Sequence, residues 1–188
     1  MKSATPAFDT RESLLDIEAA HPDWWFFPEE PLVQGFHGTG KIFIVGDQPS
    51  TDAWGEDHSH RRAFYDLLAA EKAGDCHLTD LYKRRGLAGE LKRALPRLPG
   101  DFNEHRKIFL REVELLGRST ILALGVDAYH LVKTYVPELR NSDIVLKRVW
   151  HFGTVRHGKL IPFRRILKEA IRAARQTQGE GGKSDTAI

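Results

Sequence analysis

The chain has 188 residues, of which 41% are hydrophobic and 29% are charged, a composition typical of one globular domain with its own core. Its one cysteine, Cys76, excludes an intrachain disulfide framework, a four-thiolate zinc site and a four-cysteine iron–sulfur cluster. No apolar run approaches the roughly 20 residues that cross a bilayer, and no signal-peptide pattern opens the chain, so we expect a cytoplasmic protein without membrane contact.

The predicted elements alternate between helices and short apolar strands. A first helix is expected over residues 10–20, with Asp9 and Glu12 at capping-box spacing. The aromatic residues 24–27 are predicted to pack in the core or to cover one edge of the sheet. Strands are expected at residues 42–46, 76–79, 120–124 and 144–152. Helices are expected at residues 62–70, 87–95, 102–116, 128–135 and 162–174.

This alternation predicts an α/β fold, a three-layer α/β/α sandwich with a central four-stranded parallel sheet. We expect residues 1–175 to form one domain, of which residues 1–39 are a helical and aromatic N-terminal extension. Residues 176–188 are polar and glycine-rich, and we expect them to form a disordered tail.

The most informative stretch is the strand predicted at residues 42–46. Its apolar, partly β-branched residues indicate burial on both faces, as in a parallel sheet. Gly46 allows a sharp exit from the strand, and Pro49 prevents a regular continuation. Asp47 and Gln48 are therefore expected at the carboxyl end of a central strand, where open α/β sheets bind their ligands.

Polar side chains also accompany the ends of the other three strands. Asp80 follows the second strand, Asp127 the third, and His151 and His157 lie at the end of the fourth and beyond it. Since parallel strands end at one edge, we expect these groups to converge there, beside basic clusters that would suit phosphates. Ordinary structural roles stay open: a turn cap for Asp47, a loop brace for Asp80, packing for the histidines and solvated helix faces for the basic clusters.

Residues 57–60, Asp-His-Ser-His, contain side chains that can bind metals. Alternating residues of a strand point in opposite directions, however, and no cysteine is near. We therefore expect this segment to be a mobile loop over the site, and we expect neither a metal nor a cofactor.

Four segments, in order along residues 40–175, resemble motifs of the uracil-DNA glycosylase superfamily. Residues 46–50, Gly-Asp-Gln-Pro-Ser, resemble the first motif, which is Gly-x-Asn-Pro-Gly in the mismatch-specific branch. Residues 62–65 are similar to the Asn-Arg-Phe-Trp helix start of that branch. Residues 78–85 resemble the signature Thr-Asn/Asp-Leu-Val-Lys-Arg, and residues 122–129 resemble the Ala-Leu-Gly-x-x-Ala stretch.

The chain departs from the superfamily pattern at three points. Gln48 stands where the first motif carries aspartate or asparagine, although Asp47 matches the glutamate of the iron–sulfur branches. The cluster cysteines of those branches are missing. The final His-Pro-Ser or Asn-Pro-Ser motif is also missing; His151 is nearest to it by strand context, and His157 is the second candidate.

The resemblance implies a monomeric DNA glycosylase, which hydrolyses the N-glycosidic bond of uracil or a related damaged base in DNA without a cofactor. Asp47 would stabilise the sugar cation or orient water, Gln48 would position water, and His151 would donate to a base carbonyl. The residues expected to bind the everted base are Trp54, Asp80 and His157. The residues expected to contact DNA phosphates are Ser50, Lys83, Arg84, Arg156 and Lys159.

Two other functions stay open. Gln48 and the missing final motif are compatible with a glycosylase-like module that binds nucleic acid or nucleotide but has altered chemistry. The same strand ends would also suit a hydrolase of a small nucleoside or phosphate ester. The basic clusters favour DNA over a small ligand, because a small ligand needs few phosphate contacts.

Overall fold

The computed structural model describes residues 9–40, 42–50, 59–87, 90–93, 98–117, 120–142, 144–151 and 160–180. Four parallel strands form one sheet in the order β2-β1-β3-β4. They are β1 (Phe43–Gly46), β2 (His77–Asp80), β3 (Thr120–Leu124) and β4 (Val145–Val149). The helices are α1 (Thr10–Ala20), α2 (Ser59–Ala70), α3 (Glu90–Arg93), α4 (Phe102–Leu116), α5 (Gly125–Tyr135) and α6 (Leu160–Glu180). Short 3-10 helices lie at η1 (Gly35–His37) and η2 (Pro137–Asn141).

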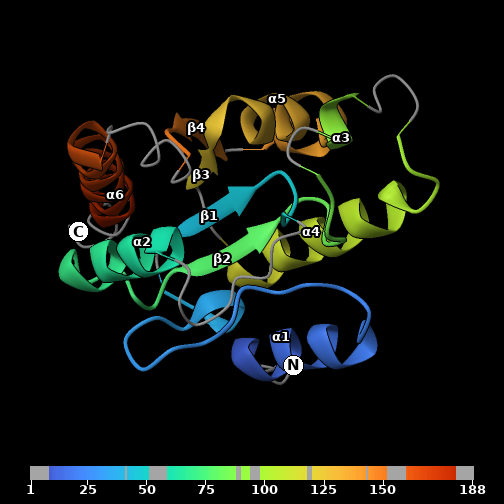
Figure 1. Cartoon of the computed structure of the whole chain (residues 1–188), viewed down its shortest axis with the longest axis horizontal. Coiled ribbons are helices and arrows are strands. Elements are labelled where there is room, and N and C mark those ends of the chain that lie inside the picture. The colour runs from blue at the N-terminus through green and yellow to red at the C-terminus, as the bar shows by residue number, and fades with distance from the viewer. Residues whose placement is uncertain are drawn as a thin grey trace, which may run out of the picture.

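The core has two parts, one on each face of the sheet. Ile44 and Leu122 pack with buried residues of α2 and α6, while Phe43 and Ile121 pack with buried residues of α4 and α5. Successive side chains of a strand point to opposite faces, so a strand covered on both sides is apolar throughout. Helices therefore lie on both sides of the sheet (Figure 1), and the predicted α/β fold with a four-stranded parallel sheet is confirmed.

Several predicted boundaries differ from the structure for identifiable reasons. Helix α5 begins at Gly125, three residues early, because the φ of +93° at Gly125 turns the chain from β3 directly into the helix. Helix α6 extends to Glu180, so the prediction of a disordered tail is wrong for residues 176–180. Once the buried part of a helix has formed, adding further residues is cheap compared with nucleation. Residues 181–188 lie outside the described residues.

The N-terminal extension packs against the β2 side of the sheet (Figure 1). The side chain of Asp9 accepts a hydrogen bond from the backbone N–H of Arg11 at 3.0 Å and so caps α1. Phe26 and Phe27 are buried in the core, which confirms core packing for part of the aromatic segment. No described helix is both long and apolar enough to cross a membrane.

Candidate active site

The ends of β1 and β2 bring two carboxyl groups to one edge of the sheet. Gly46 pairs with Asp80, and the pairing continues beyond the strands, since Tyr82 N–H donates to the Asp47 carbonyl at 3.0 Å. A Cβ atom added to Gly46 would clash with Oδ1 of Asp80. The Asp80 carboxyl group therefore lies directly against the Gly46 backbone, and a side chain at residue 46 would force that carboxyl group or the strand to move.

Burial gives the two carboxyl groups unusual protonation behaviour. The Asp80 side chain is buried, with only 5% of the residue exposed. Burial, followed by repulsion from Asp47, raises the pKa of Asp80 well above its ordinary 3.8, although Lys83 opposes the rise. Burial also raises the pKa of Asp47. Hydrogen bonds from the backbone amides of Asp47 and Gln48 lower that pKa in part, and the charge of Asp127 raises it further. We expect Asp80 to retain its proton at a pH where Asp47 is ionised.

The raised pKa of Asp80 predicts a pH-dependent stability. A carboxyl group whose pKa is higher in the folded protein contributes stability below pH 3.8, and this stability is lost as the pH rises through the folded-state pKa. Asparagine cannot ionise, so the Asp80→Asn protein does not lose this stability at high pH. Its free energy of unfolding should exceed that of the wild type by about 1–3 kcal/mol at high pH and by little below the ordinary pKa. Urea unfolding of both proteins across the pH range measures the difference, and a constant difference would contradict the prediction.

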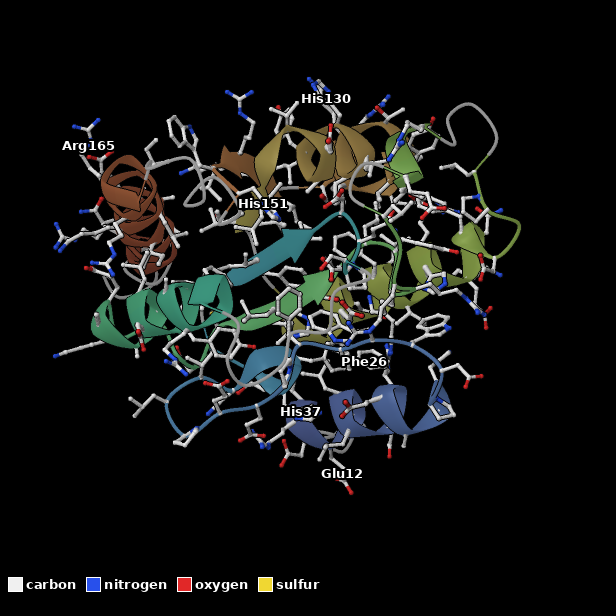
Figure 2. The ribbon with its side chains drawn as sticks, in the orientation of Figure 1. Glu12, Phe26, His37, His130, His151 and Arg165 are labelled. Carbon is white, nitrogen blue, oxygen red and sulfur yellow. The ribbon has the colours of Figure 1, made fainter. Side chains whose placement is uncertain are left out.

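His151 and Asp127 complete the edge from the side of β3 and β4. A Cβ atom added to Gly125 would lie 3.2 Å from Cβ of His151, so His151 packs against the first residue of α5. Figure 2 shows His151 beside the start of that helix. Asp127 lies in the first turn of α5, and its charge acts on Asp47. The structure thus gathers Asp47, Asp80 and His151 along one edge of the sheet. Asp127, which was also expected there as the polar residue after the third strand, lies near enough for its charge to act on Asp47.

Gln48 fixes the loop after β1. Its Oε1 accepts a hydrogen bond from the backbone N–H of Leu91 in α3 at 3.0 Å, and its side-chain amide packs closely against Gly86. Ser50 forms a parallel bridge with Gly86, and its carbonyl faces Nη1 of Arg85 at 3.5 Å. This arrangement assigns Gln48 a structural hydrogen bond in addition to its predicted contact with water.

Lys83 and Arg84, the two predicted phosphate contacts that follow β2, lie in different environments. Lys83 is fully buried, and its Nζ lies 2.8 Å from Oε1 of Glu112 and donates to the Asp80 carbonyl at 2.9 Å. The prediction that Lys83 binds a phosphate is therefore wrong, because the ammonium group points into the domain. The Arg84 side chain is half exposed, and its Nε lies 2.7 Å from Oδ2 of Asp101, so its guanidinium stays accessible to a ligand.

Four predicted site residues lie outside the described residues: Trp54, Arg156, His157 and Lys159. Residues 57–58 of the histidine-containing loop also lie outside them, and residues 59–60 begin α2. Within the ranges that the structure describes, no cluster of three or more histidine, cysteine or acidic residues is arranged to hold a metal ion.

A hollow of about 190 Å³ lies between α5, η2 and β4. Its wall is mainly apolar, with Val132, Leu139 and Leu146 among its members, and it contains none of the predicted site residues. The sheet edge is the candidate site instead, because it carries the carboxyl groups whose pKa values are raised.

This edge of the sheet combines the carboxylate of Asp47, the more deeply buried carboxyl group of Asp80 and the imidazole of His151. A carboxylate can stabilise a developing cation or take a proton from water, while a neutral carboxyl group or an imidazole can donate to a departing group. These functions suit hydrolysis of a bond whose leaving group carries negative charge. No protein-family model matches the chain, and no curated protein matches it either.

Proposed function

We propose that the chain is a DNA glycosylase of the uracil-DNA glycosylase type, acting on uracil or a related damaged base. The observation that supports this most is the juxtaposition of Asp47 and Asp80, whose charges influence each other where β1 and β2 end. The motif resemblance at residues 46–50 and 78–85 falls on these same two strand ends. His151 at the end of β4 adds a hydrogen-bond donor to the same edge.

In the proposed reaction, the C1′–N bond breaks and its electron pair leaves with the base. Ionised Asp47 stabilises the positive charge on the sugar and accepts a proton from the water whose oxygen bonds to C1′. The neutral Asp80 donates its O–H to a base carbonyl, while its own carbonyl oxygen accepts from a base N–H. His151 donates a second hydrogen bond to the departing base, which finally takes up the proton released from water.

The loop after β2 supplies the proposed phosphate contact. The exposed Arg84 lies four residues after Asp80, and the neighbouring Arg85 lies over the Trp25 ring, 5.6 Å from its centroid. Arg84→Ala should weaken binding to any DNA sequence and reduce the slope of log affinity against log salt by roughly one unit. Fluorescence anisotropy from low to moderate salt measures that slope; an unchanged slope would remove Arg84 from the interface.

A panel of labelled oligonucleotides tests the proposed activity. Single and double strands containing uracil, hypoxanthine or xanthine are incubated with the protein, and abasic sites are then cleaved with alkali. We expect strand cleavage at one or more of these bases, and none at the undamaged control strand. Absence of cleavage for the whole panel would contradict the proposed function.

One observation favours a second candidate, a nucleic-acid-binding module without turnover. The carbonyl oxygen of Gln48 is already occupied by Leu91 N–H, which leaves that side chain less free to position water. This candidate predicts salt-dependent binding to the same oligonucleotides with no abasic sites formed.

A further inference from the structure

A buried polar cluster lies behind the candidate site and joins β2 to α4. Its members Lys83, His77 and Glu112 have no exposed surface. The Glu112 carboxylate contacts both of the others, with Oε1 2.8 Å from Lys83 Nζ and Oε2 3.3 Å from His77 Nε2. The Lys83 ammonium group also donates to the carbonyl of Asp80 at 2.9 Å.

This cluster holds both ends of one short strand. His77 is the first residue of β2 and Asp80 is the last, while Lys83 lies three residues further on. Among the described strands, β2 pairs only with β1, so it lies at an edge of the sheet. A four-residue edge strand has few ladder hydrogen bonds to fix its register. The Glu112 carboxylate contacts His77 directly and reaches the Asp80 carbonyl through Lys83, so it restricts movement along the strand.

The backbone of Lys83 is fixed as well as its side chain. Its N–H faces Nδ1 of His105 at 3.2 Å, and its carbonyl accepts from Trp25 N–H at 2.8 Å. Burial, then the Lys83 charge, lowers the pKa of His105 to about 4, so the ring is neutral near pH 7 and Nδ1 can accept this hydrogen bond. His105 and Trp25 therefore fix the backbone of Lys83, while the Lys83 side chain holds the Asp80 carbonyl.

Such a cluster is costly as a stabilising device. Burial alone would raise the pKa of Glu112, yet the Lys83 ammonium and the His77 ring bring it below its ordinary value, so the carboxylate is buried in its charged form. Replacing a buried ion pair with apolar side chains of similar size often leaves stability unchanged or increases it. The hydrogen bond from Lys83 to the Asp80 carbonyl indicates that the cluster places Asp80 rather than stabilises the fold.

We propose that Lys83 and Glu112 are positioning residues that hold the Asp80 carboxyl group against Gly46 and beside Asp47. This inference rests on the proposed glycosylase function, in which Asp80 contacts the base. Neither Lys83 nor Glu112 touches the substrate; they act through the Asp80 peptide.

The double variant Lys83→Met/Glu112→Leu separates positioning from stability. We expect it to melt at a temperature no lower than the wild type, to bind DNA with unchanged affinity and to release the base at least about tenfold more slowly in single-turnover assays. If this variant melts at a lower temperature, the test uses Lys83→Met/Glu112→Gln, which keeps a hydrogen-bonding group beside His77. We expect the same melting temperature, DNA affinity and slower base release for that variant. The matched control is Arg111→Met/Glu114→Leu, which removes an exposed ion pair from the same helix and should alter neither rate nor affinity.

A spectroscopic readout keeps this test distinct from that of the proposed function. NMR records the side-chain carboxyl carbon of Asp80 and the amide of Gly46 in the wild-type protein, in the Lys83/Glu112 variant and in the Arg111→Met/Glu114→Leu control. We expect both signals to shift in the Lys83/Glu112 variant and to stay in place in the Arg111/Glu114 control. Unchanged signals, or base release at the wild-type rate, would overturn the positioning role, whereas a wild-type protein inactive on the whole panel would overturn only the proposed function.

Discussion

Asp47→Asn should reduce the rate of base release by roughly 10²–10⁴-fold, the usual contribution of a general acid or base. Asparagine retains the shape of the side chain but can neither accept a proton from water nor oppose positive charge on the sugar. DNA affinity should change little, since Asp47 is not among the predicted phosphate contacts. Single-turnover release of a labelled base, together with anisotropy for binding, measures both quantities.

An exposed aspartate provides the control for this substitution. Asp66 lies on the outer side of α2, and Asp66→Asn should leave base release unchanged. Turnover by Asp47→Asn at the wild-type rate would exclude Asp47 from the mechanism. A parallel loss of DNA binding would instead assign Asp47 to the structure of the loop.

Gly46→Ala should abolish base release and lower the free energy of unfolding by about 1–3 kcal/mol, the usual cost of overpacking. The new methyl group would clash with Oδ1 of Asp80, so either the carboxyl group or the strand must move. Chemical denaturation measures the stability, and the oligonucleotide assay measures the activity.

Two further variants identify the cause of that effect. Gly46→Ala/Asp80→Ala removes the clash, so it should recover most of the stability without recovering activity. Gly100→Ala is the matched control, because a Cβ atom added there meets nothing within 4 Å. A Gly46→Ala protein that is stable and fully active would contradict the close packing of Asp80 against β1.

Local sequence was sufficient to predict the sheet and the first strand end. The apolar run before Gly46 predicted a buried central strand, and the polar residues after it predicted the edge that carries Asp47. What local sequence did not contain was the approach of Asp80 to Gly46, because this contact depends on the register between β1 and β2. Register is a tertiary property, set by pairing between segments distant in the chain.

The buried charges were also missed, because charged side chains are usually exposed. For Glu112, a signal was present in the helix periodicity. The buried positions of α4 include His105, Phe109, Glu112 and Leu116, which follow the three-and-four spacing of a helix face. Glu112 therefore occupies the apolar stripe of its helix, and a carboxylate at such a position predicts a buried partner. Lys83 lies in a loop, where no comparable periodicity indicates its direction.

Binding of an intact substrate analogue, mapped residue by residue, tests the location of the site most directly. An oligonucleotide carrying 2′-fluoro-2′-deoxyuridine resists hydrolysis, because the fluorine destabilises a cationic sugar, so it can be titrated into labelled wild-type protein. We predict that the largest backbone amide shifts fall on Asp47, Asp80, Gly125 and His151. Shifts confined to the hollow between α5, η2 and β4, with none where β1 and β2 end, would contradict the account.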